Sequence, residues 1–242
     1  LSHLSKMLDK HHSLPEAWAE IPEPEEFEQF PTEENQVYFV HFDMVQAEMM
    51  IITRDETFNP DLMGSAYLFN SYFGAGLSSI VFQEIREQKA LAYSAYAFFT
   101  SPREKDLHHY LRAYVGTQAD KLEQASTAML DLINDMPHVP AQFEASRQAA
   151  LKNIATDWTT GSSIYWSRET ARDRGLEYDI RKDIYASIQE LDFEAVDGFF
   201  KEHIADRPRT FLVLGHRDQV DMEVLENLGE VKELTLEEIF GY

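Results

Sequence analysis

The pattern of apolar and polar positions divides the chain into two parts. Residues 1–35 begin with LSHLSKMLDKHHSLPEAWAE, which predicts one or two short helices, and continue with IPEPEEFEQFPTEEN, which is acidic and broken by prolines. An acidic segment that is broken by prolines is typical of an extended linker or arm. From Gln36 onward the apolar positions become regular. We therefore expect an arm over residues 1–35 and one folded domain over residues 36–242.

Several apolar runs after the arm have the length and composition of β-strands. In chain order they are QVYFVHFD, EMMIITRD, the aromatic run from Leu91 to Thr100, HHYLRAYVG, the short buried run RTFLVLG and, near the end, VKEL. Only MVQA separates the first two runs, a spacing that would suit a hairpin between them. The polar turn SPREKD predicts a second hairpin, between the third and fourth runs.

Helical signals lie between the two predicted hairpins. Asn59-Pro60 opens a helix with an apolar stripe, because proline is accepted in the first turn. The run Gly74–Gly76 ends that helix as a tight turn, in which glycine adopts positive φ with little steric penalty. Ser78 or Ser79 can cap the next helix, which is expected to run to about Lys89.

The second half of the chain is mostly helical in its pattern. Residues 118–135 and 141–157 are amphipathic, and the prolines of MPHVP separate them. Further helices are predicted over IYWSRETARDRG, RKDIYASIQ and FEAVDGFFKEHI, the last with Asp192 as its cap, and over residues 222–227. The order of elements predicts an α+β fold, a mainly antiparallel sheet with helices packed on one face.

Composition and charge limit the classes of function. With 242 residues, 44% of them hydrophobic, the chain can form a substantial core, and it contains no apolar run long enough to span a membrane. Its formal charge of −22 repels nucleic acid and anionic membranes and attracts cationic ligands. The lack of cysteine excludes disulfides and thiolate metal sites. We expect a soluble protein, cytoplasmic or periplasmic, without nucleic-acid or membrane partners.

Metal-binding and nucleophile motifs are missing from the sequence. None of the nine histidines belongs to an HExxH or HxxEH motif, and the adjacent pairs His11-His12 and His108-His109 point apart in a helix or strand. No GxSxG elbow is present. The segment GAGLSS follows a predicted helix and lacks the GK[ST] ending of a phosphate loop, so a tight turn is favoured over a nucleotide site.

One arginine on the predicted helix after this turn has an unusual position. Val81 and Ile85 form the core face of the helix, and Arg86 lies at the edge of that face, next to Phe82. An arginine beside Glu87 is, by itself, more often a solvated surface residue.

One tyrosine on the following strand completes the pattern. Tyr93 is expected to share a face with Ala95, Ala97 and Phe99, because side chains alternate along a strand. The two small alanines would leave room beside the phenol, so that it and the Arg86 guanidinium could converge on one open space. A strand tyrosine is otherwise usually part of the core.

These residues belong to a longer segment that resembles a known family. FGAGLSSIVFQEIREQKALAYSAYA is similar to the segment GGGxSSRLFQxIRExxGLAYSVxS of the inverted-zincin peptidases, which include pitrilysin, insulin-degrading enzyme and the mitochondrial processing peptidase. YDIRKDIYASIQELDFEAVDGFFKEHI and RTFLVLGHRDQVDMEVLENLGEVKELTLEEIF resemble later parts of the same proteins, so the resemblance covers about Gln36 to Tyr242. The sequence departs from the family where Ala75 and Ala90 replace glycines and Ile80-Val81 replaces Arg-Leu.

The resemblance implies a two-half architecture. In this family one half carries HxxEH and binds zinc, and the other half has lost the metal ligands and completes the site across a chamber. Since HxxEH is missing here, the chain resembles the non-catalytic half, in which an arginine and a tyrosine seven positions later reach the substrate. Arg86 and Tyr93 match both residue types and that spacing, and are therefore expected to bind substrate.

The same resemblance implies what the chain needs from elsewhere. The chain alone is expected to hold no metal, cofactor or catalytic residue and to be inactive. Zinc and the HxxEH motif would come from a catalytic half, in the same precursor or as a separate subunit, and the substrate would be a peptide. The alternative is a non-enzymatic scaffold or interaction subunit of the same fold.

Overall fold

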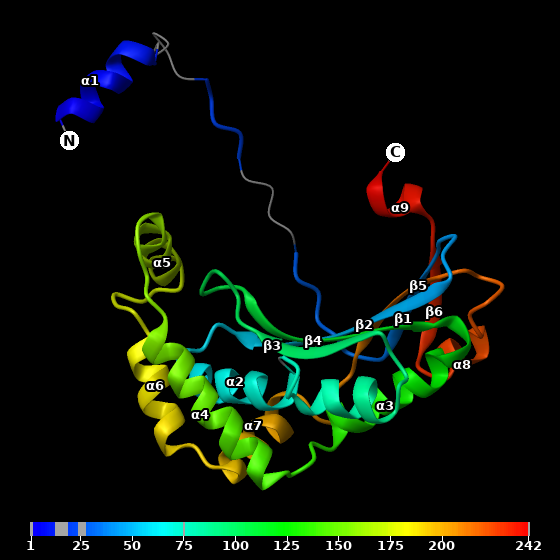
Figure 1. Ribbon diagram of the computed structural model, residues 1–242. Coiled ribbons are helices and arrows are strands. Elements are labelled where there is room, and N and C mark those ends of the chain that lie inside the picture. Colours follow the sequence, from blue (N-terminus) through cyan, green and yellow to red (C-terminus); the bar gives the residue numbers. More distant parts are fainter. Residues whose placement is uncertain (1, 13–18, 24–27, 75, 242) are drawn as a thin grey trace.

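The computed structural model describes residues 2–12, 19–23, 28–74 and 76–241, and it consists of one sheet with a layer of helices beneath it (Figure 1). The sheet has six strands in the order β3-β4-β2-β5-β1-β6. The strands are β1 (Gln36–His41), β2 (Gln46–Thr57), β3 (Ser94–Thr100), β4 (His108–Gln118), β5 (Thr210–Gly215) and β6 (Glu230–Leu234). Neighbours from β3 to β5 are antiparallel, and β1 runs parallel to β5 and β6. The α+β class with a mainly antiparallel sheet is confirmed.

The two expected hairpins differ in outcome. β3 and β4 form a hairpin in which Tyr96 is opposite Tyr114, with ring centroids 5.1 Å apart. The hairpin expected between β1 and β2 is wrong, because β5 lies between these strands and pairs with both. The connection from β1 crosses the end of β5, where the Phe42 N–H donates to the Gly215 carbonyl at 3.0 Å. An apolar strand in this central place has hydrogen-bond partners along both edges.

One face of the sheet is covered by helices. They are α2 (Met63–Phe69), preceded by the turn η1 (Pro60–Leu62) and continued by the π-helical η2 (Asn70–Gly74), then α3 (Leu122–Asn134), α4 (Pro140–Thr156), α6 (Arg181–Glu190) and α7 (Phe193–His203). The expected cap of α7 is present, since Asp192 Oδ1 accepts from Ala195 N–H at 2.9 Å. Asn59 Oδ1 likewise accepts from Asp61 N–H at 3.0 Å, where η1 begins.

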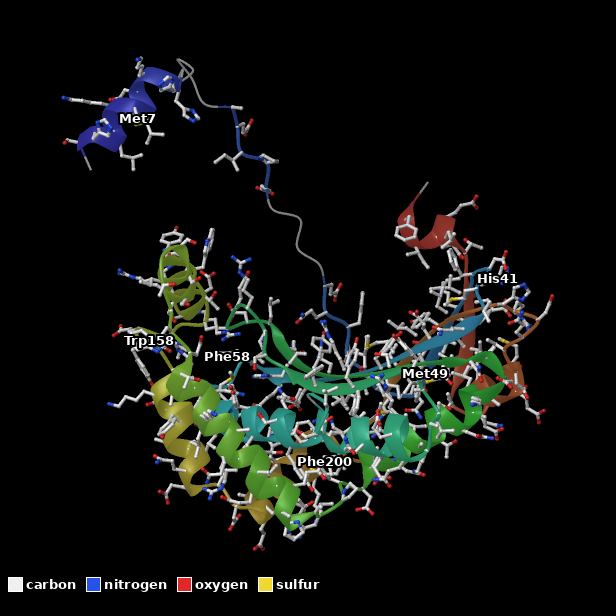
Figure 2. All side chains as sticks on the ribbon, in the orientation of Figure 1. Met7, His41, Met49, Phe58, Trp158 and Phe200 are labelled. Carbon is white, nitrogen blue, oxygen red and sulfur yellow. The ribbon has the colours of Figure 1, made fainter. Side chains whose placement is uncertain are left out.

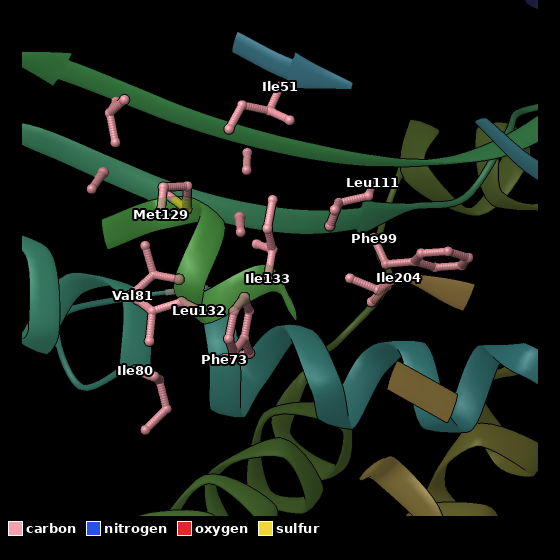
Figure 3. Close-up of a cluster of buried hydrophobic side chains, with 14 of the residues drawn as sticks. Ile51, Phe73, Ile80, Val81, Phe99, Leu111, Met129, Leu132, Ile133 and Ile204 are labelled. Carbon is pink, nitrogen blue, oxygen red and sulfur yellow. The ribbon is translucent and has the colours of Figure 1, made fainter. Parts of the chain in front are cut away.

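The hydrophobic core lies between the sheet and this helical layer. Ile51, Phe99 and Leu111 from the sheet face Phe73 and Ile133 from the helices (Figure 3). Phe200 of α7 lies deep in the same layer (Figure 2). Burial of each such side chain stabilises the fold by about 1.5–3 kcal/mol. The helices therefore cover the face of the sheet that carries these apolar side chains.

The other face of the sheet is not covered by helices (Figure 1). On this side α5 (Ser162–Asp173) rises near the β3–β4 turn and α9 (Leu236–Phe240) follows β6. The short helix α8 (Met222–Glu226) lies on the helical side and buries Leu225 in the core. In the described part of the chain, no helix is both long and apolar enough to cross a membrane.

The arm leads away from the sheet to α1 (Ser2–His11), a helix with no buried side chain. The arm contacts the sheet through Gln29, whose carbonyl accepts from the Arg54 guanidinium and whose Oε1 accepts from His108 N–H at 3.0 Å, among other residues. At the end of the arm, Asn35 Oδ1 accepts from Arg209 N–H at 2.9 Å. The division into an arm over residues 1–35 and a domain over residues 36–242 stays a prediction.

Candidate functional site

A glycine turn positions the helix that carries Arg86. Gly76 has φ +86, and a Cβ placed on Gly74 would lie 1.4 Å from the Ala97 carbonyl oxygen, so both glycines are required by the backbone path. Ala75 lies outside the described residues. Ser79 Oγ then accepts from Phe82 N–H at 3.3 Å, as expected for a capping serine.

The helix after this turn, η3 (Phe82–Gln88), is π-helical, where the sequence predicted an ordinary α-helix. Val81 and Ile85 are fully buried, so they hold the segment against the core. Arg86 lies next to Phe82, as the pattern predicted, with 40% of its side chain exposed. π-Helical turns are often found at functional sites.

The end of η3 turns the chain toward β3. Leu91 N–H donates to the Ile85 carbonyl at 3.0 Å, and the residue before it, Ala90, has φ +48. Glycine is the usual residue at such a left-handed position after a helix, and a side chain there costs roughly 1 kcal/mol. This strained alanine is the one that replaces a glycine in the resembling family.

Tyr93 lies just before β3 and is anchored to β4 through the backbone. Its N–H donates to the Gly116 carbonyl at 2.9 Å, and Thr117 Oγ1 donates to the Leu91 carbonyl at 2.5 Å. The residue is 74% exposed. A fixed backbone with an exposed phenol is therefore available for contact with another molecule.

The structure brings Arg86 and Tyr93 together. The Arg86 guanidinium carbon lies 5.5 Å from the Tyr93 ring centroid and 4.8 Å from the Phe82 ring centroid. Each contact of this kind contributes about 0.5–1 kcal/mol at an exposed position. Glu87 Oε1 is 3.7 Å from Arg86 Nε, but both side chains are exposed, and such a pair contributes little. The two rings hold the guanidinium while its N–H groups stay accessible.

The expected neighbours of Tyr93 are placed differently. Ala95, Ala97 and Phe99 are buried in the core, whereas Tyr93 precedes the strand and does not share their face. Because both alanines are buried, they leave no open room for a ligand. The expectation of a shared face is therefore wrong, although the convergence with Arg86 is present.

The outer edge of β3 is partly closed by the chain itself. Asn70 Nδ2 donates to the Phe99 carbonyl at 2.9 Å, and Phe99 N–H donates to Asn70 Oδ1 at 2.8 Å. Because both edge groups of Phe99 are used, an extended peptide cannot pair with β3 at this residue.

The Arg86–Tyr93 site can donate hydrogen bonds, and the exposed carboxylate of Glu87 lies beside Arg86. Among the described residues, no group of three or more His, Asp or Glu side chains is arranged to hold a metal ion. The site can thus bind or polarise a carbonyl, and activation of water would need groups from elsewhere.

A buried ionic cluster at the end of β2 escaped the sequence analysis. Asp55 Oδ2 lies 2.7 Å from His203 Nδ1, and its other oxygen accepts from the Arg207 guanidinium. Burial alone would raise the pKa of Asp55, but the His203 hydrogen bond and the charges of His203 and Arg207 lower it. The Asp55 hydrogen bond raises the pKa of His203. Both side chains are nearly fully buried, so the cluster stabilises the fold and is out of reach of substrate.

The adjacent pair His108-His109 behaves as the strand geometry predicts. His108 Nδ1 lies 2.7 Å from the Asp55 carbonyl oxygen, on the side of the arm. His109 is buried on the other face, stacked on Phe99 with ring centroids 5.1 Å apart, and burial lowers its pKa. The two imidazoles therefore do not form a shared metal site.

The chain resembles known peptidases in sequence. The family model described as "Peptidase M16 inactive domain" matches residues 2–146, more than half of the chain. "Uncharacterized zinc protease YmxG" of Bacillus subtilis (strain 168) is 35% identical over 66 residues, which are 27% of this chain and 15% of that protein.

Solved structures share the fold at low sequence identity. A peptidase M16 inactive domain from Pseudomonas fluorescens has a TM-score of 0.62 at 17% identity and matches 81% of this chain and 46% of its own. A protease from Helicobacter pylori has a TM-score of 0.66 at 15% identity, with coverages of 88% and 52%. Pitrilysin has a TM-score of 0.55 at 14% identity, with coverages of 86% and 22%.

The chain spans about half the length of the first two of these structures and a smaller share of pitrilysin and YmxG. The family match extends over the arm, the first two strands, the glycine turn, η3 and the β3–β4 hairpin, and so includes both Arg86 and Tyr93. The resemblance noted in the sequence is thereby confirmed: the chain belongs to the peptidase M16 family and corresponds to its inactive domain.

Proposed function

We propose that the chain is the metal-free half of a two-half zinc metalloendopeptidase, and that it binds the peptide substrate and stabilises the transition state from across the chamber. The observation that supports this role is the exposed pairing of the Arg86 guanidinium with the Tyr93 ring, 5.5 Å from its centroid. This pairing places two side chains that can donate hydrogen bonds next to each other on an exposed surface, which supports a role in substrate binding.

In this proposal Arg86 and Tyr93 donate to the carbonyl oxygen of the scissile peptide, where negative charge develops. A positioned donor of this kind lowers the barrier by about 3 kcal/mol. Zinc, bound by the HxxEH motif of the catalytic half, would supply an activated water and polarise the carbonyl. The present chain contributes binding, orientation and charge stabilisation.

The structure of the site favours such a role because both donors are held before substrate arrives. The Phe82 and Tyr93 rings flank the guanidinium, and the Tyr93 backbone is fixed to Gly116 of β4. Pre-positioned donors lose little freedom in the transition state, so more of their interaction energy lowers the barrier. The chain's acidic surface would also concentrate cationic peptides near the chamber.

The test replaces each donor in the enzyme assembled with its HxxEH-bearing half. Arg86→Ala and Tyr93→Phe should each lower kcat for a fluorogenic peptide about a hundredfold, with zinc content unchanged. Lys89→Ala, an exposed cation just after η3, is the matched control and should leave kcat unchanged. Full turnover in both donor variants would reject the role and favour a scaffold subunit of the same fold.

A further inference from the structure

The helix α5 presents a second surface that the Arg86–Tyr93 site does not involve. Figure 1 shows α5 standing apart from the sheet and the other helices, joined to α4 and α6 by two loops. No residue of this helix is buried. Helices of this length gain most of their stability from packing one face against other structure. A face of α5 is therefore available for a further contact.

The residues around α5 are unusually apolar for an exposed surface. Ile164, Tyr165 and Trp166 on the helix are each more than half exposed, as are Trp158 before it and Tyr178 after it. Figure 2 shows Trp158 at the outer side of the molecule, near the base of α5. Contiguous exposed aromatic groups mark protein interaction sites, and tryptophan and tyrosine are the residues most often found at their centres.

A hollow of about 970 Å³ lies between α5 and the segment that follows it. Ile164, Trp166 and Arg168 line one side, and Leu176, Tyr178 and Ile180 line the other. This volume is at the upper end of the range of ligand pockets, which suits several side chains of a bound segment better than one small molecule.

The charge in this hollow differs from that of the whole chain. Four arginines line it against two carboxylates, Glu177 and Asp179, whereas the chain has 43 acidic and 21 basic residues. Arg172 and Arg181 form ion pairs with neighbouring carboxylates. Arg168 has no hydrogen-bond or ion-pair partner among the residues that the structure describes, so it can take a carboxylate from another molecule.

The walls of the hollow are fixed by contacts outside it. Lys105 N–H donates to the Asp173 carbonyl at 3.1 Å, which ties the end of α5 to the β3–β4 turn. On the other side, Tyr178 Oη donates to Asp183 at 2.6 Å, and Arg181 Nη1 lies 3.0 Å from Asp157. Because these contacts already fix the walls of the hollow, which is called the groove below, the chain loses less conformational freedom when a partner binds.

We propose that this groove docks an acidic segment with phenylalanine anchors, carried by another protein. Charge complementarity determines this choice: the strongly negative chain repels an acidic segment elsewhere, and the arginines attract it here. The apolar side chains of α5 receive the anchors, and Arg168 receives a carboxylate. The Arg174 guanidinium is already engaged, since its Nε donates to the Pro102 carbonyl at 2.8 Å. This docking is independent of the catalytic support proposed for Arg86 and Tyr93.

The experiment titrates the full chain into a fluorescein-labelled peptide of three Glu-Glu-Phe-Gly repeats, in 0.15 M NaCl, and follows fluorescence anisotropy. We expect saturable binding that Trp166→Ala and Arg168→Glu each weaken about tenfold or more. Arg217→Glu is the matched control, since it makes the same charge change beside Glu233 of β6, and should shift the Kd less than twofold. Circular dichroism checks folding, which these exposed positions should not alter.

Two further peptides separate the components of the recognition. Replacement of phenylalanine by serine should remove binding, and replacement of glutamate by lysine should remove the dependence on Trp166 and Arg168. Absence of saturable binding by the acidic phenylalanine peptide, or binding that both groove variants leave unchanged, would overturn the proposal. It would equally be overturned by a dimer in sedimentation that Trp166→Ala abolishes, because the occupant would then be a second copy.

Discussion

His203 Nδ1 lies 2.7 Å from Asp55 Oδ2, which joins α7 to the end of β2 across 148 residues of sequence. Asp55 also accepts from the guanidinium of Arg207, which in turn donates to the Arg54 carbonyl at 3.4 Å. This buried cluster holds the helical layer in register with the sheet, directly beside the residues that contact the arm.

The Asp55–His203 pair predicts a dependence of stability on pH. The pKa of His203 is raised by the Asp55 hydrogen bond, so its contribution to stability is complete below the unfolded pKa of 6.5 and is lost as pH rises through the folded pKa. The pKa of Asp55 is lowered, so its contribution is lost as pH falls below 3.8. His203→Gln should therefore cost more stability near pH 5.5 than near pH 9, measured by urea unfolding.

The comparison variant for this prediction is His3→Gln, because His3 lies exposed on α1. It should leave the pH dependence of the free energy of unfolding unchanged. A His203→Gln penalty of the same size at both pH values would contradict the assignment of a charged pair. Asp55→Asn, which leaves the buried His203 without its carboxylate partner, should destabilise by about 3–5 kcal/mol at a pH where His203 is charged.

The stacking of Arg86 on Tyr93 predicts that the arginine cannot be replaced by lysine. A lysine keeps the charge but loses the planar fork that stacks on Phe82 and Tyr93. In the assembled enzyme, Arg86→Lys should lower kcat/KM for a peptide about tenfold or more. If the two donors act together, the combined Arg86→Lys and Tyr93→Phe variant should lose less activity than the product of the single losses. Independent, multiplying losses would show that the pairing has no functional coupling.

The positive φ of Ala90 predicts a stabilising substitution. Ala90→Gly relieves the left-handed strain after η3 and should raise the free energy of unfolding by about 0.5–1 kcal/mol, or the Tm by about 2 °C. The same substitution at Ala149, an exposed position inside α4, should have the opposite sign. Thermal unfolding of both variants tests this prediction. Destabilisation by Ala90→Gly would contradict the strain argument.

The contact of Gly74 with β3 predicts a severe loss of stability from a single methyl group. A Cβ at Gly74 meets the Ala97 carbonyl oxygen, part of the backbone, so η2 and β3 must separate in Gly74→Ala. We expect a loss of more than about 3 kcal/mol, measured by urea unfolding. Gly198, exposed in α7 with open space around it, provides the contrast, since Gly198→Ala should stabilise by about 1 kcal/mol. Equal effects at both sites would contradict the packing argument.

Local patterns were sufficient to predict most elements of this fold. The β3–β4 hairpin and the capped helices depend on neighbours in sequence, and their positions agree with the prediction to within a few residues. The placement of β5 between β1 and β2 depends on pairing across more than 150 residues, and no local signal encodes it. The ion pair of Asp55 and His203 also joins residues that are far apart in the sequence, so no local pattern predicts it.

The candidate site was predictable only where it depends on local sequence patterns. Arg86 follows from helical periodicity and from its match to the family, and in the π-helical segment Val81 and Ile85 are still buried while Arg86 is partly exposed. Tyr93 was assigned to the strand, which was expected to start at Leu91, whereas β3 begins three residues later, at Ser94, after Ala90 redirects the chain. The groove beside α5 combines residues from a helix and the loop after it, so neither segment alone indicated it.

The central place of β5 has a consequence for biosynthesis. Until residues 210–215 leave the ribosome, β1 and β2 each lack the neighbour that lies between them, and their apolar edges stay open. Sheets that wait for a distant partner form slowly and expose surfaces on which nascent chains aggregate. Translation that stalls before Thr210 should therefore yield a product that depends on chaperones, however complete its first four strands are.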